Sequence, residues 1–313
     1  MYHNVSLLPG SLPETLTYLK LGGRYNQPIT PNLLPKYLQK ISFGPNFNSL
    51  FVPSENIHTV VFGKSMLCEP HNFTKNVRCV EVKNSRYLEL PHTINELIIH
   101  SKNKSYRRFP HDLTYLSLSR PSEFTNNELS PLTNLRHLDL FGGDLIFQVD
   151  QIPISIVSLT LDDLNSNDPL DLGPLVNLEY FSLGDTHHKI MKLPSTLRAL
   201  KFNSDQSEVF AKEIFPASLE ILQLPRYHVQ PLSNSWLPSS LKTLIHLGEP
   251  VIGEDYRRPN LSKFYIGHLN ESILVHSPAF VADNLDIIKT YKTVYDIIIE
   301  NLLDYHLPFQ KKK

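Results

Sequence analysis

Residues 12–21 read LPETLTYLKL and residues 34–43 read LPKYLQKISF, and this pattern decides the fold. Two variable residues separate Pro from an apolar residue, and two more precede an apolar-x-apolar triplet. Thirteen copies, three of them looser, recur at spacings of 17 to 22 residues. Their first apolar residues are Leu16, Leu38, Ile57, Val77, Ile94, Leu113, Leu135, Ile156, Leu178, Leu197, Leu219, Leu241 and Leu261.

A period of this length is typical of leucine-rich solenoids. Alternate side chains of a strand face opposite sides, so Leu19 and Leu21 point inward while Tyr18 and Lys20 point outward. One repeat cannot bury its apolar face alone, whereas stacked turns share a continuous core. We therefore predict a leucine-rich-repeat horseshoe or arc of about 13 turns with a parallel concave sheet. Pro, which fixes φ and lacks an N–H donor, suits the turn that leads into each strand.

A second motif lies between the first two copies. It runs through Tyr25, Asn26, Pro28, Ile29, Leu34, Pro35, Leu38, Ile41, Phe43, Gly44, Phe47 and Asn48. Part of it returns at Pro231, Leu232, Leu237, Pro238, Leu241 and Leu244. These positions resemble the FNIP repeat, a leucine-rich-repeat variant. The resemblance implies a protein-interaction module of the slime-mould or giant-virus type, in some members joined to an N-terminal F-box. Because about 11 residues precede the first copy, we expect no F-box here.

Many leucine-rich repeats carry an asparagine three residues after the last apolar residue of the strand. At that position this sequence has Asn46 in the second copy but Arg24 in the first and Tyr227 in a late one. We therefore expect the convex turns to satisfy their buried backbone groups in another way.

The organisation that follows has three parts: an N-terminal remnant or cap over 1–11, the repeat solenoid over 12–276, and a C-terminal segment over 277–313. Within that segment, apolar residues recur at spacings of three and four from Leu285 to Leu303. This spacing predicts an amphipathic helix that caps the last turn, followed by a basic tail. The same helix could instead bind a partner or form a homo-oligomer.

Composition and charge exclude several classes of function. The formal net charge of the 313 residues is −1, so no strong field attracts nucleic acid or a membrane. We expect neither as a partner. Two cysteines and no signal peptide favour a cytoplasmic protein, in the host cytoplasm if the chain is viral. The register separates Cys79 on the concave face from Cys68 in a convex turn, so we predict no metal site and no cofactor.

Catalysis has little support in the sequence. We find no phosphate-binding Gly-rich loop, no nucleophile elbow and no metalloprotease motif. One enzyme alternative remains, because Asp139 and Asp162 would lie about 8 Å apart on neighbouring concave strands. We nevertheless predict that the protein is not an enzyme.

The central concave strands combine aromatic and polar side chains, the composition of interaction hot spots. The candidate binding residues are Tyr115, His137, Asp139, Phe141, Asp162 and Tyr180. We predict a non-enzymatic interaction module or scaffold that recognises a protein partner, which the sequence does not identify, on this face. Two alternatives stay open: a self-assembling structural component using its end faces or C-terminal helix, and the substrate-recognition part of a ubiquitin ligase with the F-box supplied in trans.

Overall fold

The computed structural model describes most of the repeat region in two compact units. Unit 1 comprises Met1–Asp168 with Thr186–His188, and unit 2 comprises Pro169–Asp185 with Lys189–Lys313. The described residues are 4–64, 72–83, 90–100, 109–121, 128–143, 148–164, 169–185, 189–203, 209–211, 213–246, 250–256, 261–268 and 271–275.

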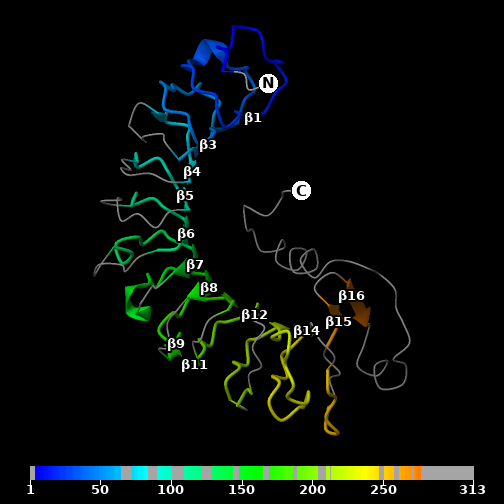
Figure 1. The fold of residues 1–313 in the computed structure, drawn as a ribbon. Helices are drawn as coiled ribbons and strands as arrows, with labels where there is room; N and C mark the ends of the chain where they lie inside the picture. The colour runs from blue at the N-terminus through cyan, green and yellow to red at the C-terminus, as the bar shows by residue number, and fades with distance from the viewer. Residues whose placement is uncertain are drawn as a thin grey trace. The chain divides into compact units, whose positions relative to one another are not determined.

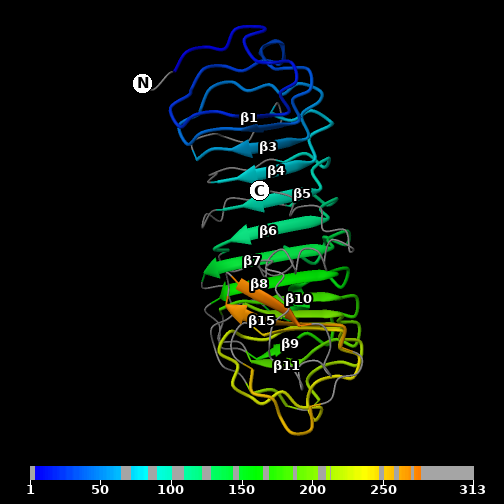
Figure 2. The ribbon, with the colours of Figure 1, turned by 90° about the vertical axis from the view of Figure 1, so that its right-hand side faces the viewer.

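Unit 1 is built on a parallel sheet in which each strand pairs with the next along the chain, from β1 to β8. Figure 2 shows these arrows pointing the same way, and Figure 1 shows loops projecting to one side of them. Two short 3-10 segments, Pro31–Leu33 and Val149–Gln151, lie in the loops. The strands are β1 (Tyr18–Lys20), β2 (Lys40–Ser42), β3 (Thr59–Phe62), β4 (Cys79–Val82), β5 (Glu96–Ile99), β6 (Tyr115–Ser119), β7 (His137–Gly143) and β8 (Ser158–Leu164).

Unit 2 continues the same construction. Its parallel strands are β10 (Tyr180–Leu183), β12 (Ala199–Phe202), β13 (Ile221–Gln223), β14 (Thr243–His246) and β15 (Lys263–His268). The last strand, β16 (Glu271–Val275), runs antiparallel to β15. A separate parallel pair, β9 (Leu170–Asp171) and β11 (Ile190–Lys192), forms between loops.

Each parallel strand of the main ladders begins two residues after the first apolar residue of a repeat. The proline turn sets this starting point. The N–H of Leu38 donates to the carbonyl of Pro35 at 3.1 Å, and the N–H of Leu241 donates to that of Pro238 at 3.2 Å. Proline can close this four-residue turn because the turn uses its carbonyl and not the N–H it lacks.

The core lies on one face of each sheet. Leu38 and Ile41 in unit 1 and Leu222 and Leu244 in unit 2 are fully buried, as the alternation of the repeat requires. Aromatic rings fill the wider part of the turns, and Phe43 packs against Phe47 with ring centroids 4.3 Å apart.

Side chains satisfy the backbone between turns in two ladders. In the first, a hydroxyl just before the first apolar residue donates to the carbonyl of the preceding turn: Ser155 Oγ to Leu135 O at 2.8 Å and Ser218 Oγ to Leu197 O at 2.7 Å. In the second, Asn26 Oδ1 accepts from the N–H of Asn48 at 2.7 Å.

The expectation about asparagine was therefore wrong in one respect. An asparagine ladder does exist at the N-terminal end, but it lies two residues beyond the position occupied by Asn46. There Asn4 Oδ1 accepts from the N–H of Asn26 at 2.8 Å, one turn before the Asn26 to Asn48 bond. The turns satisfy these backbone groups with side chains from the neighbouring turn.

The predicted parallel-sheet solenoid is confirmed. The total of about 13 turns and the horseshoe or arc stay predictions, because the two units are described separately. The predicted helical cap over 277–313 lies outside the described residues, and the three-part division stays a prediction. Within the part of the chain that the structure describes, no helix is long and apolar enough to cross a membrane.

Candidate functional site

The candidate site in unit 1 is the sheet face opposite the core, which we call the open face. Register brings its residues together in rows: Tyr115 pairs with His137, and Phe141 pairs with Asp162. Asp139 lies opposite Thr160 on β8. Five of the six predicted residues therefore share the open face of β6, β7 and β8.

A tyrosine–carboxylate pair forms the centre of this face. Tyr115 Oη donates to Asp139 Oδ2 at 2.7 Å, reaching diagonally from β6 to β7. Burial raises the pKa of Asp139, although hydrogen bonds from Thr160 and Tyr115 oppose the shift. Burial, reinforced by the Asp139 charge, also raises the pKa of Tyr115. The pair is a half-buried acidic group whose ionised form is poorly solvated.

Two more predicted residues flank this pair, and neither is fully exposed. His137 is half-buried, and burial together with the nearby Arg136 charge lowers its pKa. This shift favours the neutral form of its ring. Phe141 is half-buried and offers an aromatic surface beside Asp162.

Sequence reasoning missed the extension of this face onto β4 and β5. Glu81 Oε1 lies 3.2 Å from His100 Nε2, and His100 Nδ1 lies 3.4 Å from Ser119 Oγ on β6. The hydrogen bond to His100 lowers the pKa of Glu81, whereas burial raises that of Glu96. The repeat register identifies both glutamates. Glu81 occupies in the fourth copy the position that Asp139 occupies in the seventh. Glu96 occupies in the fifth copy the position that Tyr115 occupies in the sixth.

Cys79 is buried and free, and it opens β4 on this face beside Glu96. Burial, with the Glu96 charge and hydrogen bond adding to it, raises the pKa of Cys79 to about 12. A thiol that keeps its proton is a poor nucleophile and a poor metal ligand.

The backbone at the end of these strands adopts a left-handed conformation in three successive turns. The φ angles are 54° at Arg120, 66° at Gly142 and 53° at Asp163. Two of these residues are not glycine, so holding them there costs about 1 to 2 kcal/mol each. Such strain gathers at functional sites, and here it follows directly after Phe141 and Asp162.

Tyr180 belongs to unit 2, and its predicted exposure was wrong. It opens β10 in unit 2, and only 9% of its surface is exposed. Its register partner on β12 is Ala199. The candidate site therefore keeps Tyr115, His137, Asp139, Phe141 and Asp162.

Cys68, which the sequence analysis placed in a convex turn, lies outside the described residues. Among the residues that are described, no group of three or more histidine, cysteine or acidic side chains is arranged to hold a metal.

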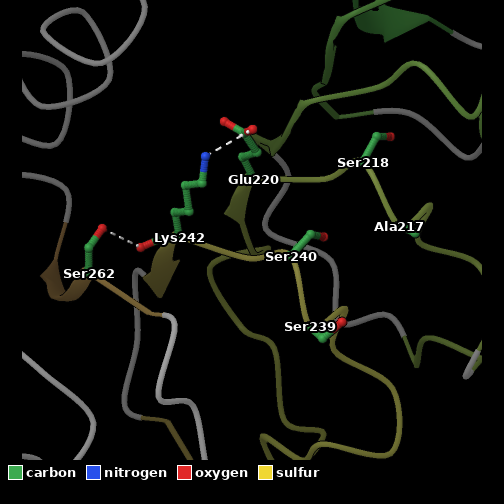
Figure 3. A pocket seen from close by; sticks show the side chains of 7 residues that line it. All are labelled: Ala217, Ser218, Glu220, Ser239, Ser240, Lys242 and Ser262. Atoms are coloured by element: carbon green, nitrogen blue, oxygen red, sulfur yellow. Dashed lines mark hydrogen bonds and ion pairs between the residues drawn. The ribbon is translucent and has the colours of Figure 1, made fainter.

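Unit 2 has a polar pocket of about 520 Å³ beside the starts of β13 and β14, shown in Figure 3. Lys242 Nζ contacts Glu220 Oε1 at 3.0 Å, and Arg198 Nη2 contacts Glu220 Oε2 at 3.1 Å. Burial opposes ionisation of Glu220, yet its hydrogen bonds with Lys242 and Arg198 outweigh burial and lower its pKa. The pocket is lined by Ala217, Ser218, Glu220, Ser239, Ser240, Lys242 and Ser262.

This pocket serves turn-to-turn cohesion. Ser240 Oγ donates to Leu219 O at 2.7 Å, and Ser262 Oγ donates to Lys242 O at 3.0 Å, as Figure 3 shows for the latter pair. Its charges are paired and these hydroxyls bond to the backbone. The open face of unit 1 is the better candidate for binding.

Comparison with known proteins agrees with the repeat pattern. A family model described as FNIP Repeat matches residues 3–46, 25–53 and 208–245. No curated protein matches the chain.

A search of solved structures gives three matches. CroV588, a circular LRR protein from a giant virus, matches with a TM-score of 0.53 and 22% identity over 92% of this chain and 53% of that one. YopM from Yersinia enterocolitica gives a TM-score of 0.45 and 17% identity over 82% and 61%. TLR13, in a complex with ssRNA13, gives 0.49 and 18% over 75% and 44%. This chain thus spans about half the length of these solved chains. The similarity to CroV588, at 22% identity, shows the fold alone.

Proposed function

We propose that this chain, which carries FNIP repeats in a leucine-rich-repeat-like solenoid, is a non-enzymatic interaction module that binds a basic segment of a partner protein. The binding surface is the open face of β4 to β8. Solenoids of this type are commonly used for protein–protein interaction, and that is the starting point for the proposal.

The observation that carries the proposal is the hydrogen-bonded pair of Tyr115 and Asp139 at the centre of the face. Carboxylates recur around it on successive strands, at Glu81, Glu96 and Asp162. Strands lie about 4.8 Å apart, so a bound segment crossing them meets several carboxylates.

Arginine is the side chain that fits this chemistry best. Its guanidinium can bond a carboxylate through two N–H groups and stack on an aromatic ring. Asp139 supplies a poorly solvated carboxylate, and Phe141 supplies a ring beside Asp162. An arriving cation would supply the opposite charge that stabilises the ionised form of Asp139.

Selection from a displayed library of random peptides tests the proposal. We expect the protein to enrich sequences rich in Arg and Lys, and the double variant Asp139→Asn, Asp162→Asn to lose that enrichment. The matched control is Asp112→Asn, which removes an exposed carboxylate from the turn before β6.

Each variant should first be shown to unfold at the same temperature as the parent chain. Enrichment of acidic or purely apolar peptides would contradict the proposed partner chemistry. Equal enrichment by the double variant would contradict the proposed face.

A further inference from the structure

The first strand of unit 1 leaves one edge of the sheet without a strand partner among the described residues. β1 is the end strand in the sheet order, and β2 is its neighbour. The bonds to β2 use the carbonyl of Thr17, which accepts from the N–H of Lys40 at 3.0 Å, and the N–H of Leu21, which donates to the carbonyl of Ser42 at 2.9 Å.

Alternation along a strand then fixes which backbone groups of β1 face away from β2, toward the unpaired edge. Odd-numbered residues of β1 bond to β2, so the N–H and C=O groups of Tyr18 and Lys20 point to the unpaired edge. An edge that presents ordered donors and acceptors is a template for another strand.

Apolar side chains of the N-terminal segment and of the first repeat are also exposed or only half-buried. Val5 is 68% exposed and Leu8 is 67% exposed. Leu16 and Leu19 are only half-buried, although the equivalent Leu38 and Ile41 one turn later are fully buried. The strand part of the first turn, around Leu16 and Leu19, therefore lacks the covering that the later strands obtain from the turn before them.

We propose that a second copy of this chain covers this end, with the two β1 strands paired antiparallel about a two-fold axis at Leu19. In that register Tyr18 of each copy lies opposite Lys20 of the other. The N–H and C=O groups of Tyr18 at the edge then bond to those of Lys20 in the other copy, and the two Leu19 side chains meet on the core side.

The side chains on the open side of this junction are complementary. A lysine ammonium is attracted to the face of a tyrosine ring. Tyr18 already has this contact within one copy, since Lys40 Nζ lies 5.7 Å from its ring centroid. The two-fold axis would produce two Tyr18–Lys20 pairs, as a self-complementary interface requires. This dimer is independent of the basic partner proposed for the open face.

Analytical ultracentrifugation of the full chain over a range of concentrations tests the dimer. We expect a species of twice 35.9 kDa. Lys20→Pro removes the outward N–H without touching the ladder to β2, and it should weaken dimerisation about tenfold or more. Lys20→Ala is the matched variant, because it keeps that N–H and should weaken the dimer less.

A residue swap tests the register separately. Tyr18→Lys places two lysines opposite each other and should weaken the dimer. Adding Lys20→Tyr restores a lysine–tyrosine pair in this register and should recover the dimer. A chain that stays monomeric at every concentration overturns the proposal. So does a dimer insensitive to Lys20→Pro, or a swap that dimerises no better than Tyr18→Lys alone.

Discussion

Asn26→Ala should loosen the contact between the first and second turns of unit 1. Its Oδ1 accepts from the N–H of Asn48 at 2.7 Å and from Ser49 Oγ at 2.9 Å. Truncation removes this one acceptor and both of its hydrogen bonds. Ser49 keeps a partner, because its hydroxyl also donates to the backbone carbonyl of Asn26 at 2.9 Å. The net loss is thus the single bond to the N–H of Asn48.

One such bond contributes about 0.5 to 1.5 kcal/mol to the free energy of unfolding. We expect a loss of about 1 kcal/mol, which should speed opening-dependent hydrogen exchange of the Asn48 amide about fivefold. Equilibrium unfolding in urea measures the first quantity. Hydrogen–deuterium exchange of the segment containing Asn48 measures the second.

Asn46→Ala is the matched control. Asn46 occupies the position that the usual asparagine rule selects, yet its exposed side chain makes no hydrogen bond to another described residue. Its truncation should change stability by less than about 0.5 kcal/mol. If Asn46→Ala costs more than Asn26→Ala, or if Asn48 exchanges equally fast in both variants, the reasoning about this ladder is wrong.

Three further outcomes follow from the structure. Burial raises the pKa of Asp139, so the folded chain binds the Asp139 proton more tightly than the unfolded chain does. The free energy of unfolding therefore falls as pH rises from about 4 through the raised pKa. Asp139→Asn should flatten this part of the pH profile of stability, and an unchanged slope would show that Asp139 does not cause it. Gly44→Ala would place a methyl group against the carbonyl oxygen of Gly22 and 2.7 Å from Gly23 Cα, and it should cost about 1 to 3 kcal/mol in urea unfolding, whereas Gly22→Ala meets no atom within 4 Å and should cost less. Ser218→Ala should cost about 1 kcal/mol through its lost 2.7 Å bond, and an equal cost for the exposed Ser195→Ala would refute the hydroxyl ladder.

The positions of the strands were predictable because two local signals agree. Proline closes a turn at a constant distance before each strand, and alternation then assigns each side chain to the core or the open face. Leu116, for example, had to point inward wherever Tyr115 pointed outward. The five candidate residues in unit 1 share a face for that reason.

The hydrogen-bond ladders between turns could not be predicted from the repeat pattern. Which side chain reaches the neighbouring turn depends on the path of the loop, and spacing alone does not define that path. Asn46 has the usual spacing, but the side chain that bonds to the backbone of the next turn is that of Asn26. The burial of Tyr180 was not predictable either, because alternation assigns a side chain to a face and does not say how far its neighbours cover it.

The rest of the open face could have been predicted from the register. Glu81 and Glu96 occupy outward positions, and the attention given to aromatic residues left them out. Their addition changes the expected partner from a protein of any charge to one with a basic segment. The open face of β4 to β8 is therefore defined by carboxylates as much as by its aromatic rings.

Hydrogen–deuterium exchange of the chain with and without a selected arginine-rich peptide tests the central claim most directly. The account predicts slower exchange in the segments around β6, β7 and β8 and no change around the pocket beside Glu220 and Lys242. It also predicts that Asp139→Asn abolishes the slowing while Asp112→Asn does not. Slower exchange around Glu220 and Lys242, with β6 to β8 unchanged, would contradict the assignment of binding to the open face of unit 1.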